Sequence, residues 1–334
     1  MKFSDLLRPA EAGLYCPPGD FYIDPVAPVA RAVISHGHGD HARAGHGAVL
    51  ATRETLAIMA ARYGEDFAGG TETAAYGARF DRDGVAVALH PAGHILGSAQ
   101  CALSWNGMTI VVSGDYKRRR DPTCRGFEPV PCDVFVSEAT FGLPVFRFPP
   151  SDDEIAKLLK SVALFPERTH LVGAYALGKA QRIIRLLREA GYDKTLYMHG
   201  ALAGMNALYE RHGVSLGPLA PATDTSRNAL PGEIVLAPPS AIADKWARRF
   251  ADPIPAFASG WMMVRARARQ RHVELPLVVS DHADWDELTL TATELKPDEL
   301  WITHGSEEAQ LRWAALNDIS ATALEIAGYE DEEE

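Results

Sequence analysis

The feature that most constrains this chain is a dense run of potential metal ligands directly after an apolar, strand-like stretch. Residues 34–41 read ISHGHGDH, and four of the last six side chains are able to bind a metal ion: His36, His38, Asp40 and His41. Packing alone gives no reason to crowd polar side chains at the end of a buried strand, because each would have to be desolvated. The run therefore predicts a metal site where the strand ends.

The spacing of the run indicates how its ligands divide. In an extended backbone residues i and i+2 point the same way, so His36 and His38 are able to bind one ion while Asp40 and His41 face elsewhere. Further candidates follow apolar runs downstream: His94, Asp115 and His304. Five histidines and two aspartates without a thiolate suit two ions that share a bridging carboxylate. Zinc is the expected metal and manganese the alternative.

Length and composition agree with a cytoplasmic enzyme. A chain of 334 residues holds one large or two ordinary domains, and its 47% hydrophobic content supplies ample core. We expect no membrane span and no secretory signal, because no apolar stretch is long enough and the first residues do not fit a signal peptide. The four cysteines show no CxxC spacing, so we expect them to be reduced packing residues.

The charge distribution qualifies the net charge of −11, which by itself argues against a polyanionic partner. Residues 330–334 supply five negative charges and are expected to be a solvated end. Two basic groups are candidates for nucleic-acid binding: residues 117–120 (KRRR) and the alternating Arg265, Arg267, Arg269 and Arg271. On a strand this alternation would put four guanidiniums on one face, as a track for phosphates. A solvated basic edge that prevents strand pairing is the alternative.

Short apolar runs bounded by turn residues predict strands that alternate with helices. The expected strands are 32–34, 109–113, 134–137, 170–173, 195–198, 233–236, 277–280 and 300–303. The clearest helix spans 177–190, where one apolar stripe is followed by Gly191. Prolines interrupt regular structure at 143–150, and ligand candidates are absent from there to Ser280. Because His304 lies beyond this gap, we expect the middle of the chain to be an insertion.

Two further motifs give the sequence a family resemblance. Residues 136–142 (VSEATFG) resemble the acidic motif A of the β-CASP nucleases, and residues 280–284 (SDHAD) resemble their motif B. With the seven ligand candidates, the chain resembles the metallo-β-lactamase superfamily and, within it, the β-CASP group that includes RNase J, the cleavage-and-polyadenylation endonuclease and Artemis. The segments 13–25 and 196–200 and the compact length look most like the bacterial ligase-associated DNA exonucleases.

The resemblance implies an α/β fold with two domains. Residues 1–147 and 273–334 would form a four-layer αββα metallo-β-lactamase sandwich, and residues 148–272 an inserted α/β β-CASP cap domain. The active site would lie in the cleft between them.

The resemblance also assigns the ligands to two Zn²⁺ ions, with Mn²⁺ as the alternative. The first ion would be held by His36, His38 and His94, and the second by Asp40, His41 and His304, with Asp115 bridging both. Such a pair of ions activates a water for in-line attack on a phosphodiester, so Asp40 also counts as catalytic. His282 is the expected general acid, oriented by Glu138 through its other ring nitrogen. An ordinary surface His–Asp pair is the alternative interpretation of residues 280–284.

The cap is expected to supply the substrate contacts, and six of its residues are candidates: Lys179, His199, Ser259, Gly260, Arg265 and Arg267. Lys179 lies where a strand ends and a helix begins, a place suited to phosphate, although the spacing is not that of a P-loop. Ser259 and Gly260 also follow a strand and would bind a terminal phosphate, beside Trp261, which would stack a base. Core packing of Trp261 and strand capping by His199 are the alternatives.

The expected function is that of a dinuclear-metal phosphodiesterase acting as a DNA exonuclease in DNA repair. Its substrate would be single-stranded or end-containing DNA, and the resemblance implies a DNA ligase and a helicase as pathway partners. RNA is the alternative substrate, for an RNase J-like or endonucleolytic ribonuclease, since a histidine such as His304 is associated in this group with RNA processing. We favour DNA because metal coordination already explains His304.

Two alternative functions belong to other classes. A nucleic-acid-binding accessory protein would use the same ligands for a structural zinc ion with a closed coordination shell. Hydrolysis of small esters, as in lactamases or glyoxalase II relatives, is disfavoured by the presence of Glu138 and His282 together.

Overall fold

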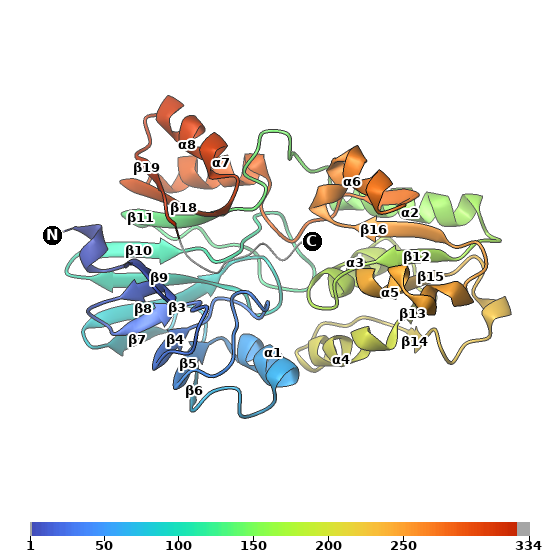
Figure 1. Ribbon diagram of the computed structural model, residues 1–334, viewed down its shortest axis with the longest axis horizontal. Coiled ribbons are helices and arrows are strands. Elements are labelled where there is room, and N and C mark those ends of the chain that lie inside the picture. Colours follow the sequence, from blue (N-terminus) through green and yellow to red (C-terminus); the bar gives the residue numbers. More distant parts are fainter. Residues whose placement is uncertain (1, 326–334) are drawn as a thin grey trace. The chain divides into compact units, whose positions relative to one another are not determined.

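The computed structural model describes residues 2–325, a mixed α/β structure with several sheets (Figure 1). The chain divides into two compact units, each with its own internal contacts. Unit 1 comprises residues 2–147 and 282–325, and unit 2 comprises residues 148–281. Unit 2 therefore interrupts unit 1 in the sequence, and the chain re-enters unit 1 at His282. The acidic run 330–334 lies outside the described residues.

The first sheet of unit 1 is built from N-terminal strands in chain order. Its strands pair as β1-β2-β3-β4-β5-β6, antiparallel up to β3 and parallel from there. Their bounds are β1 Arg8–Ala10, β2 Gly13–Cys16, β3 Phe21–Ile23, β4 Arg31–Val33, β5 Ala48–Ala51 and β6 Thr71–Thr73. Helix α1 (Arg53–Tyr63) follows β5, and its N-cap Thr52 accepts a hydrogen bond from the amide of Thr55. Strand β4 ends at Val33, three residues before the first candidate ligand, His36.

The second sheet of unit 1 has the strand order β19-β18-β11-β10-β9-β8-β7. The bounds are β7 Arg79–Arg82, β8 Val85–Pro91, β9 Ala99–Trp105, β10 Met108–Val112, β11 Val134–Ala139, β18 Glu299–Gly305 and β19 Ala321–Ala323. Strands β7 to β10 are antiparallel, whereas β10, β11, β18 and β19 are parallel. Because parallel strands end at the same sheet edge, residues that follow β10, β11 and β18 meet there.

Alternation along the strands sorts the apolar side chains of unit 1 between two faces of each sheet. Val112 and Val136 pack with Val33 of the first sheet in one core. Their neighbours Val111 and Phe135 face the other way, onto helix α7 (Trp285–Leu295). A third cluster places side chains of α1 against the opposite face of the first sheet. Helix α8 (Glu307–Leu316) and the 3-10 turn η1 (Phe3–Asp5) complete the described elements of unit 1.

Unit 2 contains a six-stranded parallel sheet in the order β14-β13-β15-β12-β16-β17. Its strands are β12 His170–Gly173, β13 Leu196–Met198, β14 Leu219–Pro221, β15 Ile234–Ala237, β16 Ile254–Ala258 and β17 Leu275–Leu277. The helices are α2 Ser151–Leu164, α3 Lys179–Glu189, α4 Ala203–Arg211, α5 Pro239–Ala243 and α6 Arg265–Gln270. Four 3-10 turns join them: η2 Gly200–Leu202, η3 Arg227–Ala229, η4 Lys245–Arg249 and η5 Gly260–Met263.

Most expected elements are present within two residues of their predicted bounds, and the apolar stripe of α3 is fully buried. The expected strand 277–280 is wrong. Strand β17 already ends at Leu277, because the chain turns there and the amide of Val279 donates to the carbonyl of Leu277. Within residues 2–325 none of the helices is both long and apolar enough to cross a bilayer.

The expected arginine strand is also wrong. Residues 265–270 form helix α6, and Arg271 follows it as the C-cap. Arginine and alanine are both good helix formers, and a two-residue step turns a helix by about 200°, so side chains at this spacing do not share one face. All four arginines are exposed.

Candidate metal centre

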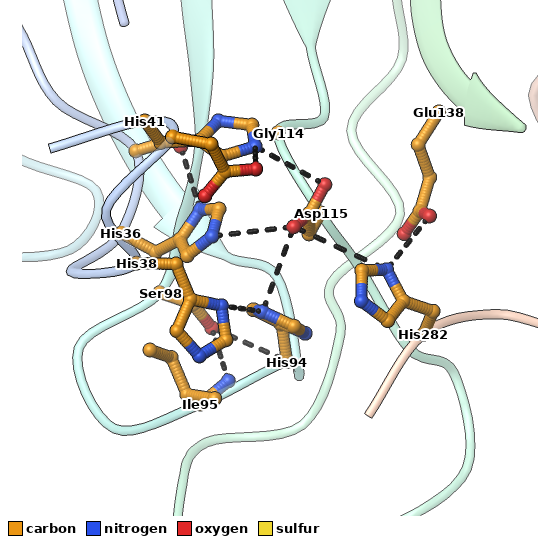
Figure 2. A network of polar contacts seen from close by, with 12 residues as sticks. His36, His38, His41, His94, Ile95, Ser98, Gly114, Asp115, Glu138 and His282 are labelled. Carbon is orange, nitrogen blue, oxygen red and sulfur yellow. Dashed lines mark hydrogen bonds and ion pairs between the residues drawn. The ribbon is translucent and has the colours of Figure 1, made fainter. Parts of the chain in front are cut away.

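The carboxylate of Asp115 lies at the centre of the histidine cluster in unit 1 (Figure 2). Its Oδ2 atom lies 3.3 Å from Nε2 of His36 and 3.7 Å from Nε2 of His94. Its other oxygen, Oδ1, lies 3.5 Å from Nε2 of His41. The two oxygens of one carboxylate therefore face two different groups of ligands, which is the arrangement expected of a bridging residue.

The first group consists of His36, His38, His94 and Asp115, whose ligand atoms all lie within 4.8 Å of one another. Nε2 of His94 lies 3.0 Å from Nδ1 of His38. The loop before His94 depends on Gly93, which has φ +79°, and a Cβ there would overlap the carbonyl oxygen of Lys117. On the C-terminal side of this loop, a hydrogen bond of 3.1 Å from the amide of His94 to Oγ of Ser98 fixes the backbone.

The second group consists of Asp40, His41 and Asp115, again within 4.8 Å. Nε2 of His41 lies 3.4 Å from Oδ2 of Asp40. The ring of His304 lies beside this group, with its centroid 5.6 Å from that of His41. A β-bulge places it there: Glu138 pairs with Thr303 and Ala139 with Gly305, so His304 is the extra residue of β18 and adopts φ +55°.

Asp24 belongs to the site although sequence reasoning gave it no role. Its Oδ2 atom lies 2.8 Å from Nδ1 of His41, and its Oδ1 accepts a 2.7 Å hydrogen bond from the amide of Ser35. A carboxylate on the outer nitrogen of a metal-binding histidine fixes the ring and directs Nε2 toward the ion. In the sequence Asp24 is marked only by its position directly after the apolar strand β3, and Asp115 similarly lies three residues after the end of β10.

Burial and mutual charges set the protonation of the cluster. Burial lowers the pKa of His36 and of His304 to about 4, so both rings are neutral at pH 7. Burial opposes ionisation of Asp115, but the surrounding histidines, His41 first, outweigh it and hold the pKa of Asp115 well below its ordinary value. Neutral imidazoles and an ionised carboxylate are the forms that bind metal ions.

Two buried polar atoms test whether a metal fits. Apart from its approach to Asp115, Nε2 of His36 has no hydrogen-bond partner within residues 2–325, and neither has Oδ1 of Asp40. Buried polar atoms normally have partners, and imidazole nitrogens with carboxylate oxygens form a donor set suited to zinc or another divalent metal. The residues present therefore fit a metal centre.

A buried acid and a histidine lie next to this cluster. Nδ1 of His282 lies 2.9 Å from Oε2 of Glu138 and 4.0 Å from Oδ2 of Asp115. Glu138 also accepts hydrogen bonds from the amide of Tyr116 (2.8 Å) and the hydroxyl of Thr140 (2.6 Å). Burial raises the pKa of Glu138, and the pull of His282 opposes this. Sequence reasoning missed Thr140 and Tyr116 as the residues that hold Glu138 in place.

The six substrate candidates all lie in unit 2, and the structure corrects the expectation for Lys179. Its side chain is buried, and its ammonium lies 3.1 Å from the carbonyl oxygen of Val279 and 3.3 Å from Oδ2 of Asp281. A lysine committed to an internal carboxylate is not a free phosphate receptor. Ser259 is also buried, and its Oγ atom accepts from the amide of Trp261 as an N-cap.

The other candidates are more accessible, except Gly260, which is buried. Nδ1 of His199 accepts from the amide of Ala201, and its ring packs edge-on against Trp246. Arg265 and Arg267 are exposed, and the guanidinium of Arg267 lies 3.8 Å from the centre of the Trp261 ring.

The basic run 117–120 also differs from its interpretation as a candidate for nucleic-acid binding. Lys117 is buried. Arg118 pairs with Glu294 and donates to Thr291, and Arg119 pairs with Asp284, all on or beside helix α7. The charges of these two arginines are therefore used within unit 1.

Comparisons with known proteins give relatives that are longer than this chain. No protein-family model matches it. A protein of Opitutus terrae named "Probable DNA ligase" is 28% identical over 300 residues, which are 88% of this chain and 28% of that protein. "Endoribonuclease YSH1" of Eremothecium gossypii is 28% identical over 222 residues, 55% of this chain and 28% of that protein. The "Cleavage and polyadenylation specificity factor subunit 3" of Dictyostelium discoideum is 32% identical over 122 residues, 35% of this chain and 16% of that protein.

A solved structure shows a similar fold. The crystal structure of a protein of unknown function from Enterococcus faecalis V583 has a TM-score of 0.56 at 11% identity, over 81% of this chain and 74% of that chain. At this identity the likeness concerns the fold alone.

Proposed function

The chain belongs to the β-CASP group of the metallo-β-lactamase superfamily, a group of metal-dependent hydrolases of phosphodiester bonds, and from this premise we propose that it is a DNA exonuclease acting in DNA repair. The observation that carries the chemistry is the position of Asp115 between two groups of ligands, with the Glu138–His282 pair next to it. A metal cluster beside a histidine held by an acid suits hydrolysis in which the leaving oxygen must be protonated.

The proposed ligands are those that lie around Asp115. His36, His38 and His94 would hold one Zn²⁺ ion, and Asp40, His41 and His304 a second, with Asp115 shared. Bound ions of this kind supply Lewis acidity and an activated water. Asp24 fixes the ring of His41. Asp40, whose Oδ1 is buried, would bind an ion and orient the attacking water.

The proposed proton donor is His282. With Nδ1–H directed at Glu138, the ring leaves Nε2 as the atom that would deliver a proton to the leaving oxygen. Tyr116 and Thr140 donate to the oxygens of Glu138, so its carboxylate has few other orientations available. The ring of His282 is thereby held in one orientation.

The proposed domain identities follow from the layers within each unit. In unit 1, helix α1, the two sheets and helix α7 follow one another through three apolar clusters, which supports an αββα sandwich. Unit 2, with its parallel sheet, would be the β-CASP cap. We place the end of the cap at residue 281, rather than at 272 as expected from the sequence.

The length of the matches supports DNA as the substrate. The relative named a DNA ligase aligns with 88% of this chain, including most of both units, whereas the two ribonuclease-type relatives described above align with 55% and 35%. A segment like this chain thus occurs within a longer protein that bears the name of a DNA-joining enzyme. We therefore propose a DNA ligase as pathway partner. The second candidate is an RNase J-like or endonucleolytic ribonuclease, favoured by the names of the shorter matches.

A cleavage assay separates these functions. Metal-loaded protein is incubated with length-matched DNA and RNA oligonucleotides, each with a 5′-phosphate or a 5′-hydroxyl, and the products are resolved on a gel. Stepwise shortening of DNA that is lost in Asp115→Ala supports the proposal. Preferred cleavage of RNA moves the assignment to the ribonuclease. Tight metal binding with no cleavage of either polymer points to an accessory protein with a structural metal.

A further inference from the structure

The basic run after Asp115 and the residues after His282 are joined by a set of contacts that we call the Arg119 clasp, formed by Arg119, Asp284 and Glu287. The guanidinium of Arg119 donates to Oδ2 of Asp284 at 2.5 Å. The backbone amide of Arg119 donates to Oε1 of Glu287 at 2.6 Å, and its Nε lies 3.9 Å from Oε2 of the same residue. One residue thus contacts both acids.

The two acids form the N-terminal capping box of helix α7. Oδ1 of Asp284 accepts from the amide of Glu287 at 3.0 Å, and Oε2 of Glu287 accepts from the amide of Asp284 at 3.2 Å. The side chain of Asp284 is 0% exposed and that of Glu287 6%. Two buried carboxylates this close repel each other unless a cation lies beside them. Arg119, 35% exposed, is that cation.

The clasp begins two residues after His282. Between them, the amide of Ala283 donates to the carbonyl of Tyr116 at 2.7 Å, and the amide of Tyr116 donates to Glu138. The segment 115–119 therefore contacts Glu138, the residue after His282 and the start of α7. A change in the first turn of α7 would move the backbone of His282 relative to Glu138.

We propose that Arg119 is a positioning residue for His282. Its fork holds the first turn of α7 and thereby keeps Nδ1 of His282 on Glu138 and Nε2 in place for the leaving oxygen. In this role Arg119 acts through the first turn of α7 and not on the substrate or the ions. The inference rests on the proposed function, because it assigns a task to His282 in that reaction.

The test is the dependence on the leaving group. Cleavage of an oligonucleotide expels a nucleoside alkoxide, which needs a proton from the general acid. Cleavage of bis(p-nitrophenyl) phosphate expels a stable phenolate, which does not. In Arg119→Met the ratio of kcat/KM on the oligonucleotide to that on the nitrophenyl ester is expected to fall about tenfold or more, in the direction of His282→Ala. Arg118→Met is the matched control. It removes the neighbouring charge and the contacts to Thr291 and Glu294, which lie beyond the first turn of α7, and is expected to keep the wild-type ratio.

A second measurement keeps the inference testable without turnover. Amide hydrogen exchange of a peptide covering residues 282–290 is expected to speed up in Arg119→Met and to be unchanged in Arg118→Met. A wild-type ratio together with wild-type protection in Arg119→Met would overturn the role of the clasp. If Arg119→Met does not fold, Arg119→Lys decides, since lysine keeps the charge but not the planar fork. A reduced ratio supports the clasp and an unchanged ratio overturns it.

Failure of the proposed function looks different. Wild-type protein that turns over neither substrate would refute the nuclease, and the exchange measurement would still decide whether Arg119 fixes the start of α7.

Discussion

Nδ1 of His282 lies 2.9 Å from Oε2 of Glu138, a contact between residues 144 positions apart in the chain. It joins the end of strand β11 to the residue at which the chain re-enters unit 1. Because Thr140 and Tyr116 hold the carboxylate, the contact sets the orientation of the imidazole.

His282→Ala is expected to lower kcat on oligonucleotides by about 10²–10⁴-fold, the usual contribution of a general acid, while metal content stays at the wild-type level. Steady-state kinetics and elemental analysis of the purified variant check this. His90→Ala is the matched control, because His90 pairs with the exposed Glu128 away from the cluster. Loss of metal together with activity in His282→Ala would instead make His282 a ligand.

Asp24→Asn is expected to weaken metal binding about 10–100-fold, because an outer carboxylate orients its histidine and raises its basicity. Competition with a chromogenic chelator measures the affinity. Asp20→Asn serves as control, since Asp20 pairs with Arg31 at the surface. Equal affinities for the two variants would show that Asp24 only supports the backbone at Ser35.

Metal binding at pH 7 is expected to release a proton from His41. Burial opposes its charge, but Asp115 and Asp40 outweigh burial and raise the pKa of His41 well above its ordinary value, so the ring is protonated in metal-free protein. His36 and His304, with pKa values of about 4, are already neutral. Affinity should therefore rise with pH until the pH passes the folded pKa of His41.

Calorimetry in two buffers of different ionisation enthalpy counts that proton, and identical heats in both would contradict its release. The raised pKa of His41 has the opposite effect on the pH dependence of metal-free stability, which falls as the pH rises. The stabilisation of the metal-free fold by protonated His41 is complete at a pH below the ordinary pKa of histidine. It is lost as the pH rises through the pKa of His41 in the folded protein.

The buried ion cluster of unit 2 predicts an order of stabilities. Asp281 lies 3.3 Å from both Lys179 and Arg182, and all three side chains are buried. Asp281→Asn leaves two buried cations without their carboxylate and is expected to cost about 3–5 kcal/mol of unfolding free energy. Arg182→Met leaves the lysine pair intact and should cost less. Urea titration of both variants gives the order, and a larger loss in Arg182→Met would contradict this account.

The clustering of the candidate ligands was predictable from the sequence because their signal is local. They lie at or just beyond the ends of apolar strands, and strands that run in the same direction bring those ends to one edge, so His94, Asp115 and His304 lie near the run at 36–41 despite long separations. Short apolar runs bounded by turn residues predicted seven strands correctly: β4, β10, β11, β12, β13, β15 and β18. The other strands of the described residues lack such runs or have other bounds, and they were not predicted.

The failures have long-range or competing causes. The basic run 117–120 was interpreted as available for nucleic acid because its partners on α7 are about 170 residues away in the sequence. No local sequence pattern predicts such distant pairs. The alternation at 265–271 matched a strand in period, but alanine and arginine propensity favoured the helix. Asp24 was passed over because a single acid after a strand carries no signal until its histidine is located.

The bulge in β18 means that the residue at position 304 can change while the pairing of the strands stays the same. His304 lies at the register shift between the pairs Glu138–Thr303 and Ala139–Gly305, so a replacement of its side chain leaves the ladder pairs on either side in place. A descendant of this sequence could exchange that histidine for glycine, which tolerates its φ of +55°, lose one proposed ligand and keep its strands in register. The number of ions that such a site would hold could then change without a change in the register of the sheet.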